Sequence, residues 1–213
     1  MSRKVLVTGG TRGIGQAIAL AFAATGDQVL AVGIEADVPT GEGGIRYETL
    51  DVRDGEAVRQ LVGGLSGLDI LVNAAGVLRR DNQEHEVEGF EEVVDVNLLG
   101  TMRASYACRD LLAETRGCVL NLASMLTFFG SGPAPAYSAS KGGVAQLTRS
   151  LAIGWAEEGI RVNAIAPGWI ETALTQPLLD DNQRSREIVE RTPLGRWGKV
   201  DDVTGAALFL CSG

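Results

Sequence analysis

The sequence predicts an α/β fold: a doubly wound parallel sheet covered by helices on both faces, in three layers. Short apolar runs alternate with segments of helical period along the whole chain, the order found where helices connect parallel strands. Glycines and polar residues recur where these runs end. With 213 residues, of which 45% are hydrophobic, the chain can build one sizeable core, so we expect a single domain over residues 1–213.

The first element is a strand that ends in a glycine cluster. Residues 5–8 form a short apolar run, glycines follow, and a segment of helical period begins near residue 14. We assign Gly9 to the tight turn, Gly13 to close approach of the backbone to a pyrophosphate, and Gly15 to packing of the helix on the strand. A glycine-rich turn that binds no ligand has the same pattern, so the motif alone is a modest signal.

The choice of cofactor depends on two charged residues near this loop. Residues 28–34 predict a second strand, and Glu35 follows it, twenty residues after Gly15. A carboxylate there binds the adenosine ribose hydroxyls and repels a 2′-phosphate, which indicates NAD. Arg12 indicates NADP, because a cation in the glycine loop can meet that phosphate. Both residues are equally consistent with solvated surface charges.

The remaining elements continue the alternation. We expect a loop over 36–44, a third short strand over 47–52, helices over 54–62, 87–114 and 136–158, and strands over 68–76, 118–123 and 160–166. We expect Asp51 to accept a hydrogen bond from the adenine amino group. Asn97 lies among apolar neighbours and needs hydrogen-bond partners. It is either a packing polar group or the residue that holds a water or a carbonyl behind Lys141.

Three residues around the 136–158 helix suit proton transfer to a carbonyl or carbinol oxygen. Tyr137 and Lys141 are four residues apart and fall on one helix face, and Ser124 stands where the 118–123 strand opens into a loop. A phenol titrates near ~10, so it needs a neighbouring ammonium such as that of Lys141 to favour its phenolate. Most Tyr–Lys pairs with this spacing are surface contacts of little consequence.

Composition excludes several classes of partner. The net charge of −8 and the pI near 4.8 argue against nucleic acid and anionic membranes. Three cysteines without metal-ligand spacing indicate reduced thiols in a cytoplasmic protein, and we expect no metal. The apolar run near the N-terminus is too short for a signal peptide, and none reaches the ~18 residues of a membrane span. We expect a small-molecule substrate.

Several motifs stand in the order and spacing of one enzyme family: Thr8–Gly15, Asn73–Gly76, Asn97, Ser124, Tyr137–Lys141 and Pro167-Gly168. Over essentially its whole length the sequence resembles the short-chain dehydrogenase/reductase family. The resemblance implies a Rossmann-type fold and a nicotinamide cofactor, NAD or NADP. It implies a catalytic set of Asn97, Ser124, Tyr137 and Lys141.

The resemblance also implies the residues that bind the cofactor, which are Gly9, Thr11, Arg12, Gly13, Ile14, Gly15, Glu35, Asp51, Val52, Asn73, Ala74, Gly76, Tyr137, Lys141, Pro167, Gly168 and Ile170. Family members are commonly tetramers, so we expect a homo-oligomer, a dimer or a tetramer. They usually continue past the position of Gly213 into a final strand. We therefore expect either a tail beyond this sequence or a sheet that lacks its last strand.

The substrate is expected from a finer resemblance. Gly76–Arg80, Ala123–Phe128 and Gly195–Gly198 most resemble the 2-deoxy-D-gluconate 3-dehydrogenases and gluconate 5-dehydrogenases of the family. We therefore expect hydride transfer between the nicotinamide and a secondary alcohol or ketone of a sugar acid. Arg79 and Arg80 are suited to bidentate capture of its carboxylate, although two solvated loop arginines are equally consistent with the composition.

Two alternatives remain open. Arg12 favours an NADP-dependent 3-oxoacyl (acyl-carrier) reductase within the same family. A catalytically silent dinucleotide-binding regulatory protein is the alternative from another class, and the intact catalytic set argues against it.

Overall fold

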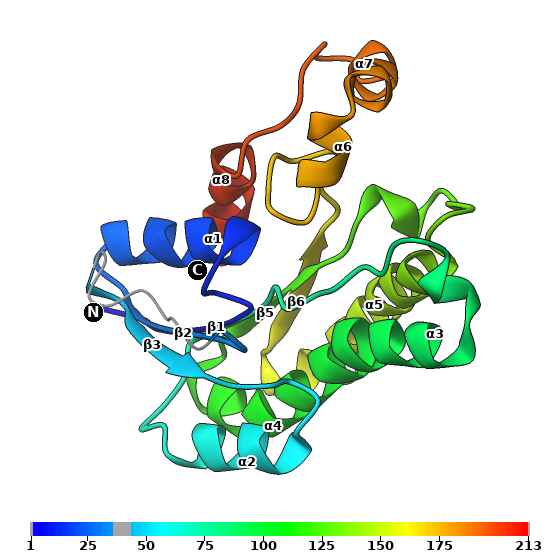
Figure 1. Ribbon diagram of the computed structural model, residues 1–213. Helices are drawn as coiled ribbons and strands as arrows, with labels where there is room; N and C mark the ends of the chain where they lie inside the picture. The colour runs from blue at the N-terminus through cyan, green and yellow to red at the C-terminus, as the bar shows by residue number, and fades with distance from the viewer. Residues whose placement is uncertain (1, 36–43, 213) are drawn as a thin grey trace.

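The computed structural model describes residues 2–35 and 44–212 and contains one parallel sheet of six strands in the order β3-β2-β1-β4-β5-β6 (Figure 1). The strands are β1 Lys4–Thr8, β2 Gln28–Gly33, β3 Arg46–Thr49, β4 Ile70–Asn73, β5 Cys118–Leu122 and β6 Arg161–Ile165. The predicted α/β fold class is confirmed. The predicted loop over 36–44 lies outside the described residues, except for Gly44.

Helices connect the strands. The α-helices are α1 Gly13–Ala24, α2 Gly55–Gly63, α3 Val87–Val94, α4 Gly100–Thr115, α5 Pro135–Gly154, α6 Gln176–Asp180, α7 Asn182–Glu190 and α8 Asp201–Leu210. Four shorter turns are η2 Gln83–His85, η3 Asp95–Leu99, η4 Met125–Thr127 and η5 Ala156–Glu158. None of the helices in the described ranges is both long and apolar enough to pass through a membrane.

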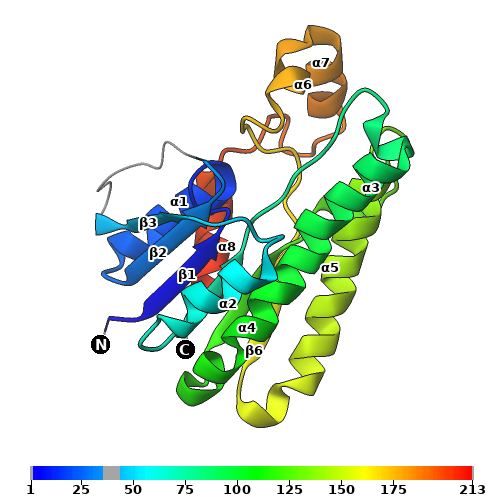
Figure 2. The same ribbon diagram turned by 60° about the horizontal axis from the view of Figure 1, so that its bottom comes forward.

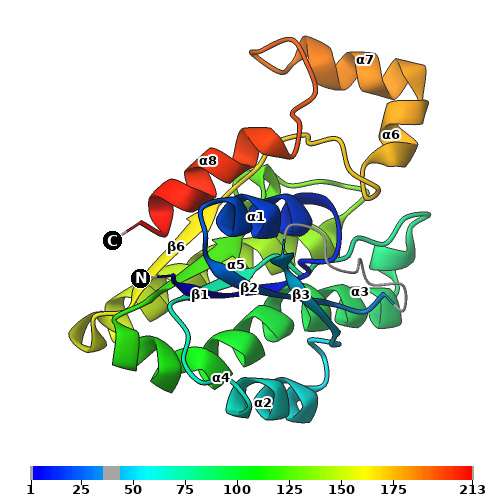
Figure 3. The same cartoon turned by 90° about the vertical axis from the view of Figure 1, so that its left-hand side faces the viewer.

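The helices form two layers around the sheet. Figure 3 shows α1 and α8 on one face and α2, α4 and α5 on the other. Phe22 and Ile18 of α1 are fully buried against the first face, and Leu112 of α4 is fully buried against the second. Because both faces are covered, the inner strands β1, β2, β4 and β5 are mostly apolar and buried, whereas the edge strand β3 is polar.

The structure differs from the sequence prediction in several places. The predicted strand over 68–76 is shorter, since β4 ends at Asn73 and small residues follow it in a loop, and the predicted helix over 136–158 ends at Gly154. The predicted helix over 87–114 is interrupted by η3, a π-helical turn that contains Asn97. The third strand ends at Thr49, so Asp51 and Val52 follow it in a loop. The segment after β6 contains α6, α7 and α8, which the sequence did not predict; α6 and α7 stand away from the sheet (Figures 1 and 2).

The sheet order reverses between β1 and β4. From β1 the chain crosses over to β2 and β3 on one side, and β4, β5 and β6 lie on the other. The crossovers diverge here, so a crevice opens at the carboxyl ends of these two strands. This is where open parallel sheets bind ligands.

A buried chain of polar side chains ties the sheet to α4 and α5. Asn73 of β4 donates to Asn121 of β5 at 2.9 Å and to Ser105 of α4 at 3.0 Å. Asn121 donates to Thr148 of α5 at 2.9 Å. All four residues are buried, so each bond replaces one that water would otherwise make. These bonds fix the height of α4 and α5 relative to the strand ends.

Replacing Asn121 with alanine is expected to lower the free energy of unfolding by about 2 kcal/mol, because two buried hydrogen bonds lose a partner. The matched control is Asn163→Ala on the neighbouring strand β6, since Asn163 makes no side-chain hydrogen bond with the described residues. Urea denaturation of both variants measures the difference. Equal losses would show that the Asn121 bonds contribute nothing beyond packing.

Candidate active site

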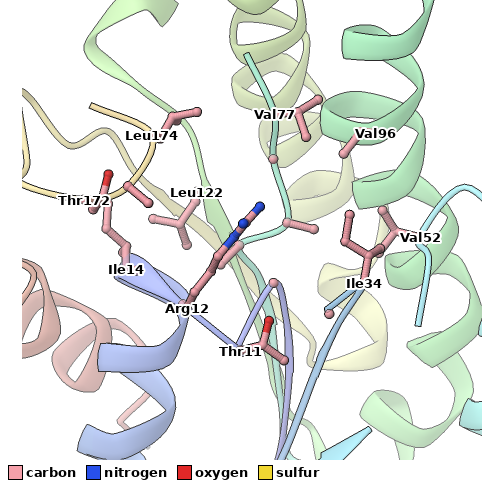
Figure 4. Close-up of a pocket in the computed structure, with 18 of the residues that line it drawn as sticks. Thr11, Arg12, Ile14, Ile34, Val52, Val77, Val96, Leu122, Thr172 and Leu174 are labelled. Carbon is pink, nitrogen blue, oxygen red and sulfur yellow. The ribbon is translucent and has the colours of Figure 1, made fainter. Parts of the chain in front are cut away.

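A pocket of about 410 Å³ lies at the carboxyl ends of the strands. Segments that follow all six strands contribute to its wall, from the β1–α1 loop to the segment after β6. Figure 4 shows two groups of side chains with Arg12 between them: Ile14, Leu122, Thr172 and Leu174 on one side, and Ile34, Val52, Val77 and Val96 on the other.

The glycine loop has the shape that a dinucleotide needs. Gly9 has φ +66°, and a Cβ there would lie 2.5 Å from the Ala75 nitrogen, so only glycine fits. Helix α1 begins at Gly13, and its N-cap residue Arg12 makes no side-chain capping bond. The first N–H groups of α1 therefore remain available to an anion at the pocket floor. The backbone shape and the donor set both fit a pyrophosphate.

Glu35 and Arg12 form an ion pair at the rim of this loop. The Arg12 Nε lies 3.0 Å from Glu35 Oε1, and the Thr11 hydroxyl donates to Glu35 Oε2. The carboxylate that would bind ribose hydroxyls and the cation that would meet a 2′-phosphate thus neutralise each other. Because neither charge is free, preference for NAD over NADP stays a prediction.

Asp51 is also paired. Its carboxylate accepts from the Arg53 guanidinium at 2.6–3.1 Å, and this hydrogen bond is the main reason that the pKa of Asp51 is lowered. Both residues line the pocket near Val52. The predicted acceptor for the adenine amino group is therefore present as a carboxylate whose position Arg53 fixes.

Tyr137 lies in the first turn of α5, and its phenol faces the pocket beside Ser124. Burial raises the pKa of Tyr137, and the hydrogen bond from the neighbouring Ser124 hydroxyl works against this shift. Ser124 is held by its own backbone, since its Oγ accepts from the Leu126 N–H at 3.2 Å. The phenol and the hydroxyl that the sequence predicted to act together are therefore in contact.

Lys141 lies one turn further along α5 and is buried. Its Nζ is 5.6 Å from the centre of the Tyr137 ring and donates to the Leu122 carbonyl at 2.6 Å. Burial lowers the pKa of Lys141 from 10.5 to about 8. The sequence analysis expected its ammonium to favour the Tyr137 phenolate. In the structure the Ser124 hydroxyl favours the phenolate, and the ammonium bonds the carbonyl at the end of β5; its effect on the phenol stays a prediction.

Asn97 is fully buried in the π-helical turn and grips the backbone of Val77. Its Oδ1 accepts from the Val77 N–H at 2.8 Å, and its Nδ2 donates to the Val77 carbonyl at 2.9 Å and to Ser140 at 3.1 Å. The carbonyl that Asn97 holds is therefore that of Val77, whereas the carbonyl bonded to Lys141 is that of Leu122. Asn97 lies behind the pocket wall rather than in it.

The two predicted substrate arginines differ in their environment. Arg79 lines the pocket but forms a bidentate ion pair with Glu92 of α3, with distances of 2.7 and 2.5 Å. Arg80 lies next to it outside the pocket wall and donates to the Leu174 carbonyl at 2.5 Å. Arg80 makes no ion pair with the part of the chain that the structure describes. Of the two arginines, Arg80 is therefore the one that could bind an anionic ligand without displacing a carboxylate of the protein.

The structure brings together nearly the whole predicted site. Of the predicted cofactor residues, all line this pocket except Asn73, whose side chain points into the sheet–helix interior, where it bonds Asn121 and Ser105. The sequence analysis missed several wall residues, among them Ile34, Arg53, Val77, Glu92, Leu122 and Leu174. Ile34, Arg53 and Val77 directly neighbour a predicted residue, and that position was the available signal. Glu92 comes from α3 and carries no such signal.

Comparisons with known proteins identify the family of this chain. Over residues 9–213 the sequence matches the family described as enoyl-(acyl carrier protein) reductase. A 2-dehydro-3-deoxy-D-gluconate 5-dehydrogenase of Bacillus subtilis is 40% identical over an alignment of 222 positions. The alignment covers 99% of this chain and 87% of that protein. The chain belongs to the short-chain dehydrogenase/reductase family.

Solved structures of dehydrogenases have a similar fold. A gluconate 5-dehydrogenase of Burkholderia cenocepacia in complex with NADP and tartrate has a TM-score of 0.92 and 32% identity, covering 100% of this chain and 89% of that one. A candidate 2-deoxy-D-gluconate 3-dehydrogenase of Agrobacterium tumefaciens with bound NADP has a TM-score of 0.89 and 43% identity, covering 99% and 89%.

The short-chain dehydrogenase/reductase described here is an NAD(P)-dependent oxidoreductase that acts on CH–OH groups, as the sequence predicted. The alternative of a catalytically silent regulatory protein is set aside. When bound, the nicotinamide supplies the hydride acceptor or donor. The glycine loop, Glu35, Asp51 and the segment after β6 are the parts of this chain that would hold the cofactor.

The buried lysine predicts a pH-dependent stability. Burial lowers the pKa of Lys141 to about 8 in the folded chain from 10.5, so between these values the unfolded chain binds the extra proton. The free energy of unfolding of the wild type should therefore rise, relative to Lys141→Met, as the pH increases through this window. Thermal unfolding of the cofactor-free proteins measures it. Lys199→Met, at an exposed lysine, is the matched control for loss of one positive charge; a Lys141→Met difference that stays constant with pH would contradict the expectation.

Proposed function

We propose that this enzyme transfers hydride between a nicotinamide cofactor and a secondary alcohol or ketone of a small sugar acid. The observation that carries the proposal is the position of Arg80 beside the pocket, where its guanidinium makes no ion pair with the described residues. The names of the relatives support the substrate class, as does the tartrate, a hydroxy acid, in the Burkholderia cenocepacia complex. A carboxylate is the natural partner of an arginine that has no other anion.

In the proposed reaction Tyr137 is the acid/base group. In oxidation its phenolate takes the proton of the substrate hydroxyl, and in reduction its phenol returns a proton to the carbonyl oxygen. Ser124 bonds the phenol, which favours the charged phenolate, and would also bond the reacting oxygen of the substrate. Lys141, anchored on Leu122, would bind the nicotinamide ribose, and Asn97 keeps the backbone of Val77 in place behind it.

An activity screen tests the substrate class. The enzyme is assayed with NAD and NADP on sugar acids such as aldonates and 2-dehydro-3-deoxyaldonates, on the corresponding neutral sugars, and on 3-oxoacyl thioesters. We expect kcat/KM to be highest for the acids. Equal or higher values for neutral sugars would assign a sugar dehydrogenase, and activity confined to thioesters would assign a 3-oxoacyl reductase, the alternative that Arg12 favours.

Removing the phenol hydroxyl is expected to abolish turnover. Tyr137→Phe should lower kcat by roughly 10²–10⁴-fold, since this is the usual contribution of a general acid/base group, while the affinity for the cofactor stays nearly unchanged. Tyr106→Phe, at an exposed tyrosine of α4, is the matched control. Steady-state kinetics and cofactor fluorescence titration measure both effects. Near-normal kcat in Tyr137→Phe would remove Tyr137 from this role.

The proposed role of Arg80 in binding the substrate carboxylate can be tested by substitution. Arg80→Gln should raise the KM for sugar acids by about tenfold and leave the KM for neutral sugars unchanged, because only the acids lose an ion pair. Arg149→Gln, at an exposed position of α5, is the control. If Arg80→Gln leaves both KM values unchanged, Arg80 does not select the substrate.

Oligomeric state and compartment are part of the same proposal. We expect a homodimer or homotetramer, supported by the exposed apolar side chains Tyr106 of α4 and Ile153 of α5, which are 54% and 79% exposed. The buried free cysteines are compatible with a reducing cytoplasm. Sedimentation analysis of the purified enzyme measures the oligomeric state, and fractionation of the source cells identifies the compartment.

A further inference from the structure

Glu84 is the buried acidic residue nearest the proposed catalytic tyrosine, and the reaction outlined above does not use it. Its side chain is 1% exposed, and it makes no ion pair in the described ranges. A buried carboxylate without a cation is costly unless hydrogen bonds satisfy it. Glu84 accepts two such bonds, both from backbone N–H groups.

These two bonds join separate parts of the site. Oε1 accepts from the Arg79 N–H at 2.9 Å, and Oε2 accepts from the Tyr137 N–H at 2.9 Å. The first partner lies in the segment after β4 that leads to Arg80. The second lies in the first turn of α5, whose N-cap residue Ala134 provides no side-chain cap. Glu84 thus caps α5 from outside the helix, where a negative charge is favourable.

Other charged groups around Tyr137 are engaged elsewhere. Lys141 of α5 bonds the Leu122 carbonyl, and Arg79 pairs with Glu92 of α3. His85, the residue after Glu84 in η2, bonds the Gly132 carbonyl at 2.9 Å. Among these residues, Glu84 is the one whose side chain accepts a hydrogen bond from the Tyr137 backbone.

We propose that Glu84 is a positioning residue: its carboxylate ties the arginine-bearing segment after β4 to the first turn of α5 and places a fixed negative charge beside Tyr137. The geometry sets the distance between the side of the pocket that would hold a substrate anion and the side that would move its proton. The proposal rests on the proposed acid/base role of Tyr137, but not on the identity of the substrate.

The charge has a direction of effect that a purely structural residue would lack. Burial is the main cause that raises the pKa of Tyr137, and the Glu84 carboxylate adds to it, whereas the Ser124 hydroxyl opposes it. A negative charge beside a phenol disfavours the phenolate, so Glu84 adds to the effect of burial in favouring the protonated form of Tyr137. Neutralising Glu84 without changing its shape should therefore favour the phenolate.

Two variants together separate position from charge. Glu84→Gln keeps the length but removes the charge, and it keeps one of the two acceptors because an amide nitrogen only donates. Glu84→Asp keeps the charge but is one methylene too short to reach both amides, so a change in the Tyr137 titration that Glu84→Gln shows and Glu84→Asp lacks belongs to the charge. In the cofactor-free protein, hydrogen exchange at the Tyr137 and Arg79 amides measures position. NMR of protein labelled with ¹³Cζ-tyrosine measures the phenolate fraction at alkaline pH. The chain has three tyrosines, so Tyr137→Phe identifies the signal.

In Glu84→Gln we expect the midpoint of the Tyr137 titration to fall, because the carboxylate charge that raises the Tyr137 pKa is gone. In Glu84→Asp we expect exchange at the two amides to be faster, on the order of tenfold, with the titration close to that of the wild type. Glu86→Gln, an exposed carboxylate two residues away, is the matched control and should change neither.

A Glu84→Gln variant whose Tyr137 titrates as in the wild type would overturn the proposal, even if exchange were faster, because it would leave Glu84 a merely structural role. If Glu84→Gln does not fold, unchanged amide exchange in Glu84→Asp overturns it instead. Both measurements need no substrate, so an activity screen that fails to find a sugar acid would leave this test intact.

Discussion

The amide of Asn97 is the interaction on which the geometry of the site most depends. It pairs with both the N–H and the carbonyl of Val77, as a neighbouring strand would, at the point where β4 has left the sheet. The chain beyond β4 would otherwise leave two backbone groups without partners away from water, which is costly. The third bond, to Ser140, places α5 so that Lys141 follows directly. The helix is locally distorted into a π-helical turn at Asn97, where the side chain makes these hydrogen bonds.

The same polar chain continues into the interior. Thr101 donates to the Asn97 carbonyl at 2.8 Å, Ser105 donates to the Thr101 carbonyl, and Asn73 donates to Ser105. Through Asn121 the chain reaches α5 again. The ends of β4 and β5 and the two helices behind them are thus one hydrogen-bonded unit. A partly satisfied network of this kind is worse than an apolar core, so the unit constrains all of its members together.

The fold and the outline of the pocket were predictable because they depend on local patterns. The β1–α1 turn needs glycine at Gly9, and parallel strands bring their ends to one edge whatever the side chains between them. What the sequence could not provide were pairings across elements. The partnership of Arg79 with Glu92, the anchoring of Lys141 on Leu122 and the burial of Glu84 in a polar run join segments whose distance is set only by tertiary packing. Of the helices after β6, α6 and α7 were missed because short polar segments have a weak helical period.

The pocket of this acidic chain contains more cations than anions, but most of its cations are already paired. Arg12 is held by Glu35, Arg53 by Asp51 and Arg79 by Glu92. An anionic ligand that sought any of these arginines would have to displace a carboxylate. A pyrophosphate is therefore better served by the uncapped N–H groups of α1, which carry no competing anion. The paired arginines then act as rigid walls, and the unpaired charge of Arg80 at the edge of the site is left to distinguish one anionic substrate from another.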